Sequence, residues 1–190
     1  MSIFRFPIRT TALLFLLAAG CIRVDLPEQQ VRETHTYDLR PLPQEERGFP
    51  CEVEILPFFS DAPARYKMLY RKGTELRVEE YRKWGQSPAA MLTRLFRSAF
   101  VPSKVTEEEY RLSGTILQFE ANEETNTADL TVKYVFSTLR NEDPVFVRTL
   151  TVSEKRKDGS PEAFAEAMSL AARRQIREIK QLIQQEIKPK

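Results

Sequence analysis

The stretch that decides the fold is 66–100, which reads YKMLYRKGTELRVEEYRKWGQSPAAMLTRLFRSAF. Its first half holds two short strand patterns, 68–72 and 75–80. They lie on either side of Gly73-Thr74, a pair of residues typical of a tight turn. This arrangement predicts a β-hairpin at the start of the stretch.

The second half of the stretch predicts an amphipathic helix that ends near Val101-Pro102. Ser87 can cap the first turn, because a serine side chain accepts a hydrogen bond from an otherwise unpaired backbone N–H. Pro88 suits the first helical position, where its missing N–H would have no partner in any case. Apolar residues at three- and four-residue spacing give the helix a core face: Leu92, Leu95, Phe96, Ala99 and Phe100.

Further strand patterns lie on both sides of this stretch. They are 34–39, 51–58, 107–119, 130–137 and 145–152. We expect the last three, which are the longest, to form the antiparallel centre of a sheet. The alternation of polar and apolar residues blurs at Leu117, which indicates either a β-bulge or a strand covered on both faces.

A second helix is predicted at the C-terminal end, where Ser160-Pro161 repeats the capped start and the pattern continues to about Ile187. Its narrow apolar stripe consists of Phe164, Met168, Ala172, Ile176, Ile179 and Ile183. Its basic residues are Arg173, Arg174, Arg177 and Lys180. They form either a solvated face or a contact with anionic lipid headgroups. The sequence therefore predicts an α/β (α+β) fold, in which an antiparallel β-sheet packs against two main helices in the order strands, helix, strands, helix.

The N-terminus predicts a secretory signal that is removed. Residues 1–9 are basic without an acid, and 11–19 form an apolar core well under the roughly 20 residues that a membrane-spanning helix needs. The run Leu17-Ala18-Ala19-Gly20-Cys21 resembles a bacterial lipobox. In such lipoproteins the cysteine thiol receives a diacylglyceryl group, the chain is cut before the cysteine, and the new amine receives an acyl group such as palmitate. The alternative is an ordinary signal peptide with a chance cysteine.

We therefore predict three parts: a lipoprotein signal peptide over 1–20, a lipidated N-terminus and tether over 21–33, and a single domain over 34–190. Each buried methylene contributes about 0.8 kcal/mol, so several acyl chains on one cysteine make a stable membrane anchor. The residue after Cys21 is Ile22. By similarity to enterobacterial lipoprotein sorting, a residue other than Asp there favours the periplasmic face of the outer membrane.

One run of residues stands out: Tyr70-Arg71, Tyr81, Arg82-Lys83-Trp84, Ser87-Pro88, Leu92 and Leu95. This run resembles the ABC-type transport auxiliary lipoproteins, which include the paraquat-inducible protein C-like lipoproteins. The likeness continues through Leu112-Ser113-Gly114 and the final helix. The resemblance implies an auxiliary component that works with an inner-membrane ABC transporter and an MCE-domain protein. Such systems move lipids or other hydrophobic molecules between the two membranes. The resemblance also implies a homo-oligomer.

A different class of function stays open, namely a stand-alone lipid-binding or envelope-scaffold lipoprotein. A large apolar cavity would favour that class, and a self-complementary surface patch would favour the transport component. The residues that carry the resemblance also have two interpretations. They are Tyr70, Arg71, Tyr81, Arg82, Trp84 and Pro88. Either they pack the corner between hairpin and helix, or Trp84 with Arg82 or Arg71 anchors a subunit interface.

We expect no catalytic, metal or cofactor site beyond the acyl groups on Cys21. The sequence has no Gly-rich phosphate loop, no GxSxG and no HExxH motif, and it has one histidine, His35. Cys51 would be a lone thiol, which we expect to be buried and inert. The chain has 29 basic and 27 acidic side chains; Arg5 and Arg9 leave with the signal, so both counts become 27. This balance gives no indication of nucleic-acid binding.

Overall fold

The computed structural model of the chain describes residues 33–61, 65–104, 109–140 and 143–187. The predicted signal peptide, Cys21 and nearly all of the predicted tether lie outside these residues. The described residues form one compact unit. Within them, no helix has both the length and the apolar character needed to cross a membrane.

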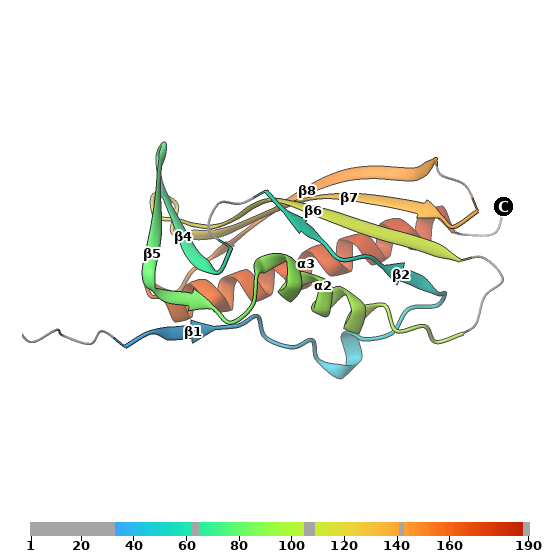
Figure 1. Ribbon diagram of the computed structural model, residues 1–190. Coiled ribbons are helices and arrows are strands. Elements are labelled where there is room, and N and C mark those ends of the chain that lie inside the picture. Colours follow the sequence, from blue (N-terminus) through green and yellow to red (C-terminus); the bar gives the residue numbers. More distant parts are fainter. Residues whose placement is uncertain (1–32, 62–64, 105–108, 141–142, 188–190) are drawn as a thin grey trace, which may run out of the picture. The chain divides into compact units, whose positions relative to one another are not determined.

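This unit consists of a mixed eight-stranded sheet and two α-helices (Figure 1). In chain order the elements are β1 (His35–Tyr37), the 3-10 helix η1 (Gln44–Glu46), β2 (Val53–Ile55), β3 (Phe59–Ser60), β4 (Lys67–Lys72), β5 (Glu75–Trp84), α2 (Pro88–Ala99), β6 (Tyr110–Asn122), β7 (Thr127–Thr138), β8 (Pro144–Lys155) and α3 (Pro161–Glu186). The strand order is β1-β5-β4-β6-β7-β8, and β2 and β3 also pair with β6. The α+β class and the order strands, helix, strands, helix are confirmed.

The direction of the strands differs in part from the antiparallel sheet that we expected. The pairs β6–β7, β7–β8 and β4–β5 are antiparallel, as predicted. However, β2, β3 and β4 all run parallel to β6 along its other edge, and β1 runs parallel to β5. Parallel neighbours need a crossover connection, and α2 supplies one between the N-terminal strands and β6. The antiparallel expectation was therefore correct for the hairpins and wrong for the pair β1–β5 and for the strands that pair with β6 across α2.

Both helices pack on the same face of the sheet, where the core lies (Figure 1). Ser87 and Ser160 cap them as predicted, because their Oγ atoms accept hydrogen bonds from backbone N–H groups three residues later, at 3.2 and 3.1 Å. All six residues of the predicted α3 stripe are buried. Gln175, which is also buried, joins α3 to the sheet: it accepts a hydrogen bond from the Tyr134 hydroxyl (2.6 Å) and donates to the Leu130 carbonyl (2.9 Å).

The irregularity predicted at Leu117 is a β-bulge. The register of β6 against β7 shifts between Ile116 and Gln118, and Leu117 itself is exposed. Phe119 consequently faces the core, and Glu120 faces the opposite side of the sheet. The sequence allowed either a β-bulge or a strand covered on both faces, and the register shift identifies the bulge.

Two predicted strand boundaries differ from the structure. The pattern 51–58 contains β2, while β3 begins beyond it, at Phe59. Phe58 is buried in the core between Phe96 and Tyr134, but Phe59 is 68% exposed. In addition, β6 extends to Asn122, three residues beyond the end of the predicted pattern 107–119.

Three basic residues of α3 contact the segment around Glu46 in η1, and we call this set of contacts the clamp. Arg173 donates to the Glu46 carboxylate (Nε to Oε2, 3.0 Å), and Arg177 lies 3.4 Å from the same carboxylate. Lys180 donates to the backbone carbonyls of Glu46 and Gly48, at 2.7 and 3.0 Å. These contacts tie η1 to α3, and the side chains of Arg174 and Arg177 remain more than half exposed.

The clamp should make stability depend on pH. Hydrogen bonds from Arg173 hold the pKa of Glu46 below its ordinary 4.5. A carboxyl group whose pKa is lowered by folding stabilises the protein above its unfolded pKa, and this contribution disappears as the pH falls through the folded pKa. We expect Glu46→Gln to reduce the free energy of unfolding by about 1 kcal/mol at pH 7, because the pair is partly exposed to solvent.

The difference between wild type and Glu46→Gln should vanish under acid conditions below the folded pKa. Urea unfolding followed by circular dichroism at several pH values measures it. Glu80→Gln, which removes an exposed carboxylate from β5, is the matched control and should change stability little at any pH. An equal loss for Glu46→Gln at acid and neutral pH would contradict the role of the ionised clamp.

Candidate functional site

The residues that carry the family resemblance do not converge on one site. Trp84, at the end of β5, is only 2% exposed and packs edge-on against Phe119 and Phe164, with ring centroids 5.3 Å away in both cases. The indole N–H of Trp84 has no hydrogen-bond partner among the described residues. This position fits the packing interpretation, since a ring enclosed by the core is not available to a second subunit.

Tyr70 and Pro88 are also buried. The rings of Tyr70 and Trp84 both pack against the same α3 residue, Phe164. The Tyr70 hydroxyl donates to the Met68 sulfur at 3.7 Å. Burial raises the pKa of Tyr70 to about 12, so this phenol stays neutral at physiological pH. By their position, Tyr70 and Trp84 belong to the junction between the hairpin and α3.

Tyr81 and Arg82, by contrast, are exposed on β5. The guanidinium of Arg82 lies 4.0 Å from the Glu79 carboxylate, a surface pair of little energetic weight. Of the six predicted residues, these two are exposed and Arg71 is partly exposed, so these three have side chains that a partner could reach.

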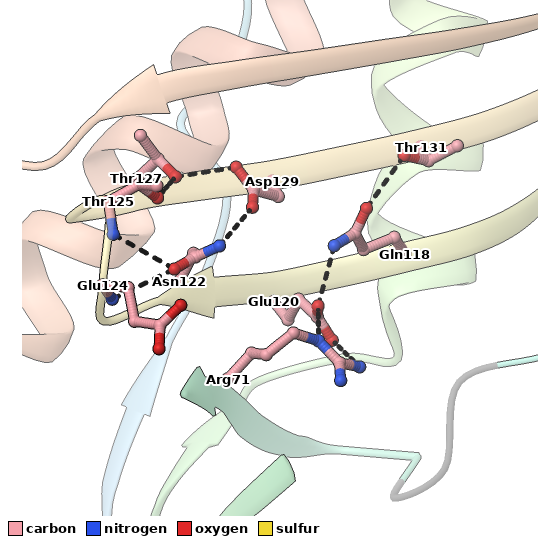
Figure 2. Close-up of polar contacts among 9 residues, drawn as sticks. All are labelled: Arg71, Gln118, Glu120, Asn122, Glu124, Thr125, Thr127, Asp129 and Thr131. Atoms are coloured by element: carbon pink, nitrogen blue, oxygen red, sulfur yellow. Dashed lines mark hydrogen bonds and ion pairs between the residues drawn. The ribbon is translucent and has the colours of Figure 1, made fainter. Parts of the chain in front are cut away.

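Arg71 belongs to a polar ladder on the side of the sheet opposite the core (Figure 2). Its guanidinium forms a two-pronged ion pair with Glu120, which is 3% exposed; Nη2 and Oε2 are 3.0 Å apart. The hydrogen bonds that Arg71 donates to Glu120 raise the pKa of its guanidinium, which stays charged. Gln118 donates to Glu120 (2.7 Å) and accepts from Thr131 (3.1 Å). The ladder thus connects β4, β6 and β7.

A second group of polar residues closes the turn between β6 and β7 (Figure 2). Asp129 accepts hydrogen bonds from Thr127 (2.8 Å) and Asn122 (3.4 Å), and the Asn122 side chain in turn accepts from two backbone N–H groups of the turn. In the described part of the chain, no three His, Cys, Asp or Glu side chains gather as metal ligands would. Glu120 in the ladder and Asp129 at the turn both accept hydrogen bonds from neighbouring donors. The two groups of polar residues are therefore structural networks.

Sequence reasoning missed Glu120, because the predicted strand pattern ended at residue 119. The available signal was the bulge at Leu117, because a one-residue shift moves every later side chain of β6 to the other face. With that shift, Glu120 falls on the same face as Thr131 and within reach of a β4 side chain.

The sheet also presents a broad surface that neither helix covers. Cross-strand neighbours from β6, β7 and β8 form three rows there: Ser113, Val135 and Val147; Thr115, Lys133 and Thr149; Gln118, Thr131 and Thr151. We call these nine residues the outer face. Lys133 is the only charged residue among them, and Val147 and Thr149 are exposed. β8 ends the strand order, so its far edge has no partner strand among the described residues.

No family model and no curated protein matches the sequence. The structure is similar to the crystal structure of protein XCC0632 from Xanthomonas campestris, of the family DUF330. The TM-score is 0.65 and the identity 17%, over 80% of this chain and 95% of that one. An uncharacterised protein of known structure gives a TM-score of 0.61 at 10% identity, over 80% of this chain and 99% of that one. At these identities the likeness shows a shared α+β fold.

Proposed function

We propose that this protein is a lipid-anchored auxiliary component of an ABC/MCE-type transport system that moves lipids or other hydrophobic molecules between membranes. It would be attached through Cys21 to the periplasmic face of the outer membrane. It would carry out no reaction of its own, and its contribution would be a docking surface. The lipobox and the family resemblance in sequence support the proposal, and so does a fold shared with a DUF330 protein.

The observation that carries the docking role is the outer face. Residues at the centre of protein interfaces are depleted in charge, and these three rows have one charged side chain among nine. The next row on the same side of the sheet contains Glu120 and Asp129, whose carboxylates are held in hydrogen-bond networks and would lie at the rim of such an interface. The far edge of β8 has no partner strand among the described residues. β8 carries Pro144, Arg148, Glu154 and Lys155, the kinds of residue that limit unwanted pairing at an edge, while Val147, Thr149 and Thr151 point to the outer face. An edge strand of this kind can pair with a strand of another chain.

We infer that the partner on this face is a second copy of the chain, within a closed ring of identical subunits. Native mass spectrometry of the full-length protein, released from membranes in mild detergent, tests this. The wild type should give one oligomer with a defined number of subunits. Thr149→Glu places an unpaired charge on an exposed outer-face position. It should lower the ratio of oligomer to monomer about tenfold, because burial of an uncompensated charge is costly.

Lys157→Glu is the control, since it alters an exposed charge outside the outer face. Circular dichroism should show that both variants keep the wild-type fold. A monomeric wild type, or a Thr149→Glu variant that assembles like the wild type, would contradict the docking role of this face. A monomer with stoichiometric lipid would instead support the alternative, a stand-alone carrier.

A further inference from the structure

An open groove of about 740 Å³ lies between the first half of α2 on one side and residues 57–60 and 65–69 on the other. Of the residues that carry the family resemblance, only Ser87 and Pro88 line it. Its volume is within the range of about 300–1,000 Å³ that is typical of small-molecule sites. The groove is separate from the outer face, and its chemistry is different.

Four basic side chains line the groove, and no acidic residue does: Arg65, Lys67, Arg94 and Arg97. Arg97 donates only to a backbone carbonyl, that of Ile55, at 3.3 Å. Arg94 is paired with the half-exposed carboxylate of Asp38, at 2.6 Å. Neither Arg65 nor Lys67 makes an ion pair with a described residue. The groove therefore keeps a positive potential, to which the N-terminal end of α2 adds.

The rest of the groove is largely apolar. Leu69 is buried on the side of β4 away from the main core cluster, and it contributes to the lining together with Pro57 and Phe58. Phe59 also lines the groove, and its ring is 68% exposed. Covering such a ring with an apolar group is favourable by roughly 25 cal/mol per Å² of buried surface. The lining thus offers apolar contact beside a cluster of positive charge.

We propose that this groove binds an anionic amphiphile, with the phosphate or carboxylate headgroup among Arg65, Lys67, Arg94 and Arg97 and the alkyl chain against Phe59 and Leu69. A free inorganic anion would satisfy the basic residues but leave Phe59 exposed. An uncharged lipid would cover Phe59 but leave Arg65, Lys67 and Arg97 without an ion-pair partner among the described residues. Only a ligand with both parts complements the whole groove. The proposal does not rest on the docking role of the outer face.

Photo-crosslinking with the full-length, lipidated protein in phosphatidylcholine vesicles tests the proposal. Three probes with a diazirine in the alkyl chain are compared: a fatty acid, a phosphatidic acid and an uncharged diacylglycerol. We expect the two anionic probes to label peptides that contain Phe59 and the first turns of α2, about tenfold more than the uncharged probe. The fatty acid and the phosphatidic acid distinguish a carboxylate headgroup from a phosphate headgroup.

Arg65→Glu combined with Lys67→Glu should reduce this labelling about tenfold, because two favourable headgroup contacts become repulsive. Lys104→Glu combined with Lys157→Glu makes the same change in net charge outside the groove lining and should leave labelling unchanged. Phe59→Ser, at an exposed position that cannot disturb the core, should weaken labelling by both anionic probes.

Several results would overturn the proposal. One is equal labelling by the uncharged probe, and another is equal labelling of the Arg65/Lys67 variant. Displacement of the probes by millimolar inorganic phosphate alone would show a site for free anions and not for amphiphiles. None of these results bears on the assembly of subunits through the outer face, so the two proposals succeed or fail separately.

Discussion

Replacing Trp84 with alanine should destabilise the domain by about 3–5 kcal/mol, the range expected when a large aromatic side chain is removed from a core. The ring lies between Phe119 of β6 and Phe164 of α3, each with its centroid 5.3 Å away. Its loss would leave a cavity where the end of the hairpin meets α3. Because native domains are stable by only about 5–15 kcal/mol, this substitution should leave much of the protein unfolded or degraded.

Denaturant unfolding of the full-length protein, followed by far-UV circular dichroism, measures the effect. Trp84→Phe should cost considerably less, because it keeps an aromatic ring and loses no hydrogen bond, the indole N–H having no partner among the described residues. Tyr81→Ala, at an exposed position of β5, should change stability by less than about 1 kcal/mol. A Trp84→Ala protein with wild-type stability and lost assembly would favour the interface interpretation instead.

Replacing Cys21 with serine should abolish membrane attachment. Serine lacks the thiol that accepts the diacylglyceryl group, and without it neither cleavage before position 21 nor acylation of the new amine would follow in the lipoprotein pathway. Two or more acyl chains are needed for stable anchoring, so their loss should change the distribution of the protein almost completely. Metabolic labelling with a clickable palmitate analogue and fractionation of inner and outer membranes measure both consequences.

Cys51→Ala is the matched control, because it removes the other cysteine without touching the lipobox. Cys51 is buried, and burial raises the pKa of its thiol, so it has the character of an unreactive core residue. The Cys51→Ala protein should keep both its acyl label and its membrane fraction. Wild-type labelling of Cys21→Ser, or a wild-type protein that is free in the periplasm, would mean that Cys21 is not the anchor.

Features governed by neighbouring residues could be predicted from the sequence. The Ser87 and Ser160 caps depend on hydrogen bonds that span three residues, and the apolar stripe of α3 depends on helical periodicity. The hairpin of β4 and β5 and the strands β6 to β8 follow from alternation and turn residues in the same way. These signals were sufficient for the α+β class and for the order of the elements.

Features governed by distant pairings could not be predicted in this way. The polar residue Glu120 continues β6 because Arg71, 49 positions earlier, supplies its counter-charge. The parallel pairing of β2, β3 and β4 with β6 depends on the crossover through α2, which alternation within one strand does not encode.

The candidate surfaces depend on distant pairings to a still greater degree. The groove brings Arg65 and Lys67 together with Arg94 and Arg97 from α2, and the spacing of these residues in the sequence suggests no common site. The outer face is likewise visible only once the register of β6, β7 and β8 is known. Trp84 illustrates the same limit, since its contact with Phe164 joins residues 80 positions apart.

The most direct test of the transport role is crosslinking of the tagged, full-length protein in intact cells, followed by affinity purification and mass spectrometry. We predict that an MCE-domain protein is recovered with it, together with further copies of the chain, and that Cys21→Ser reduces this recovery by removing the protein from the membrane. The account would be contradicted if the protein were recovered without an MCE-domain partner under conditions that preserve its assembly. It would also be contradicted if the protein were not attached to the membrane or were recovered without further copies of itself.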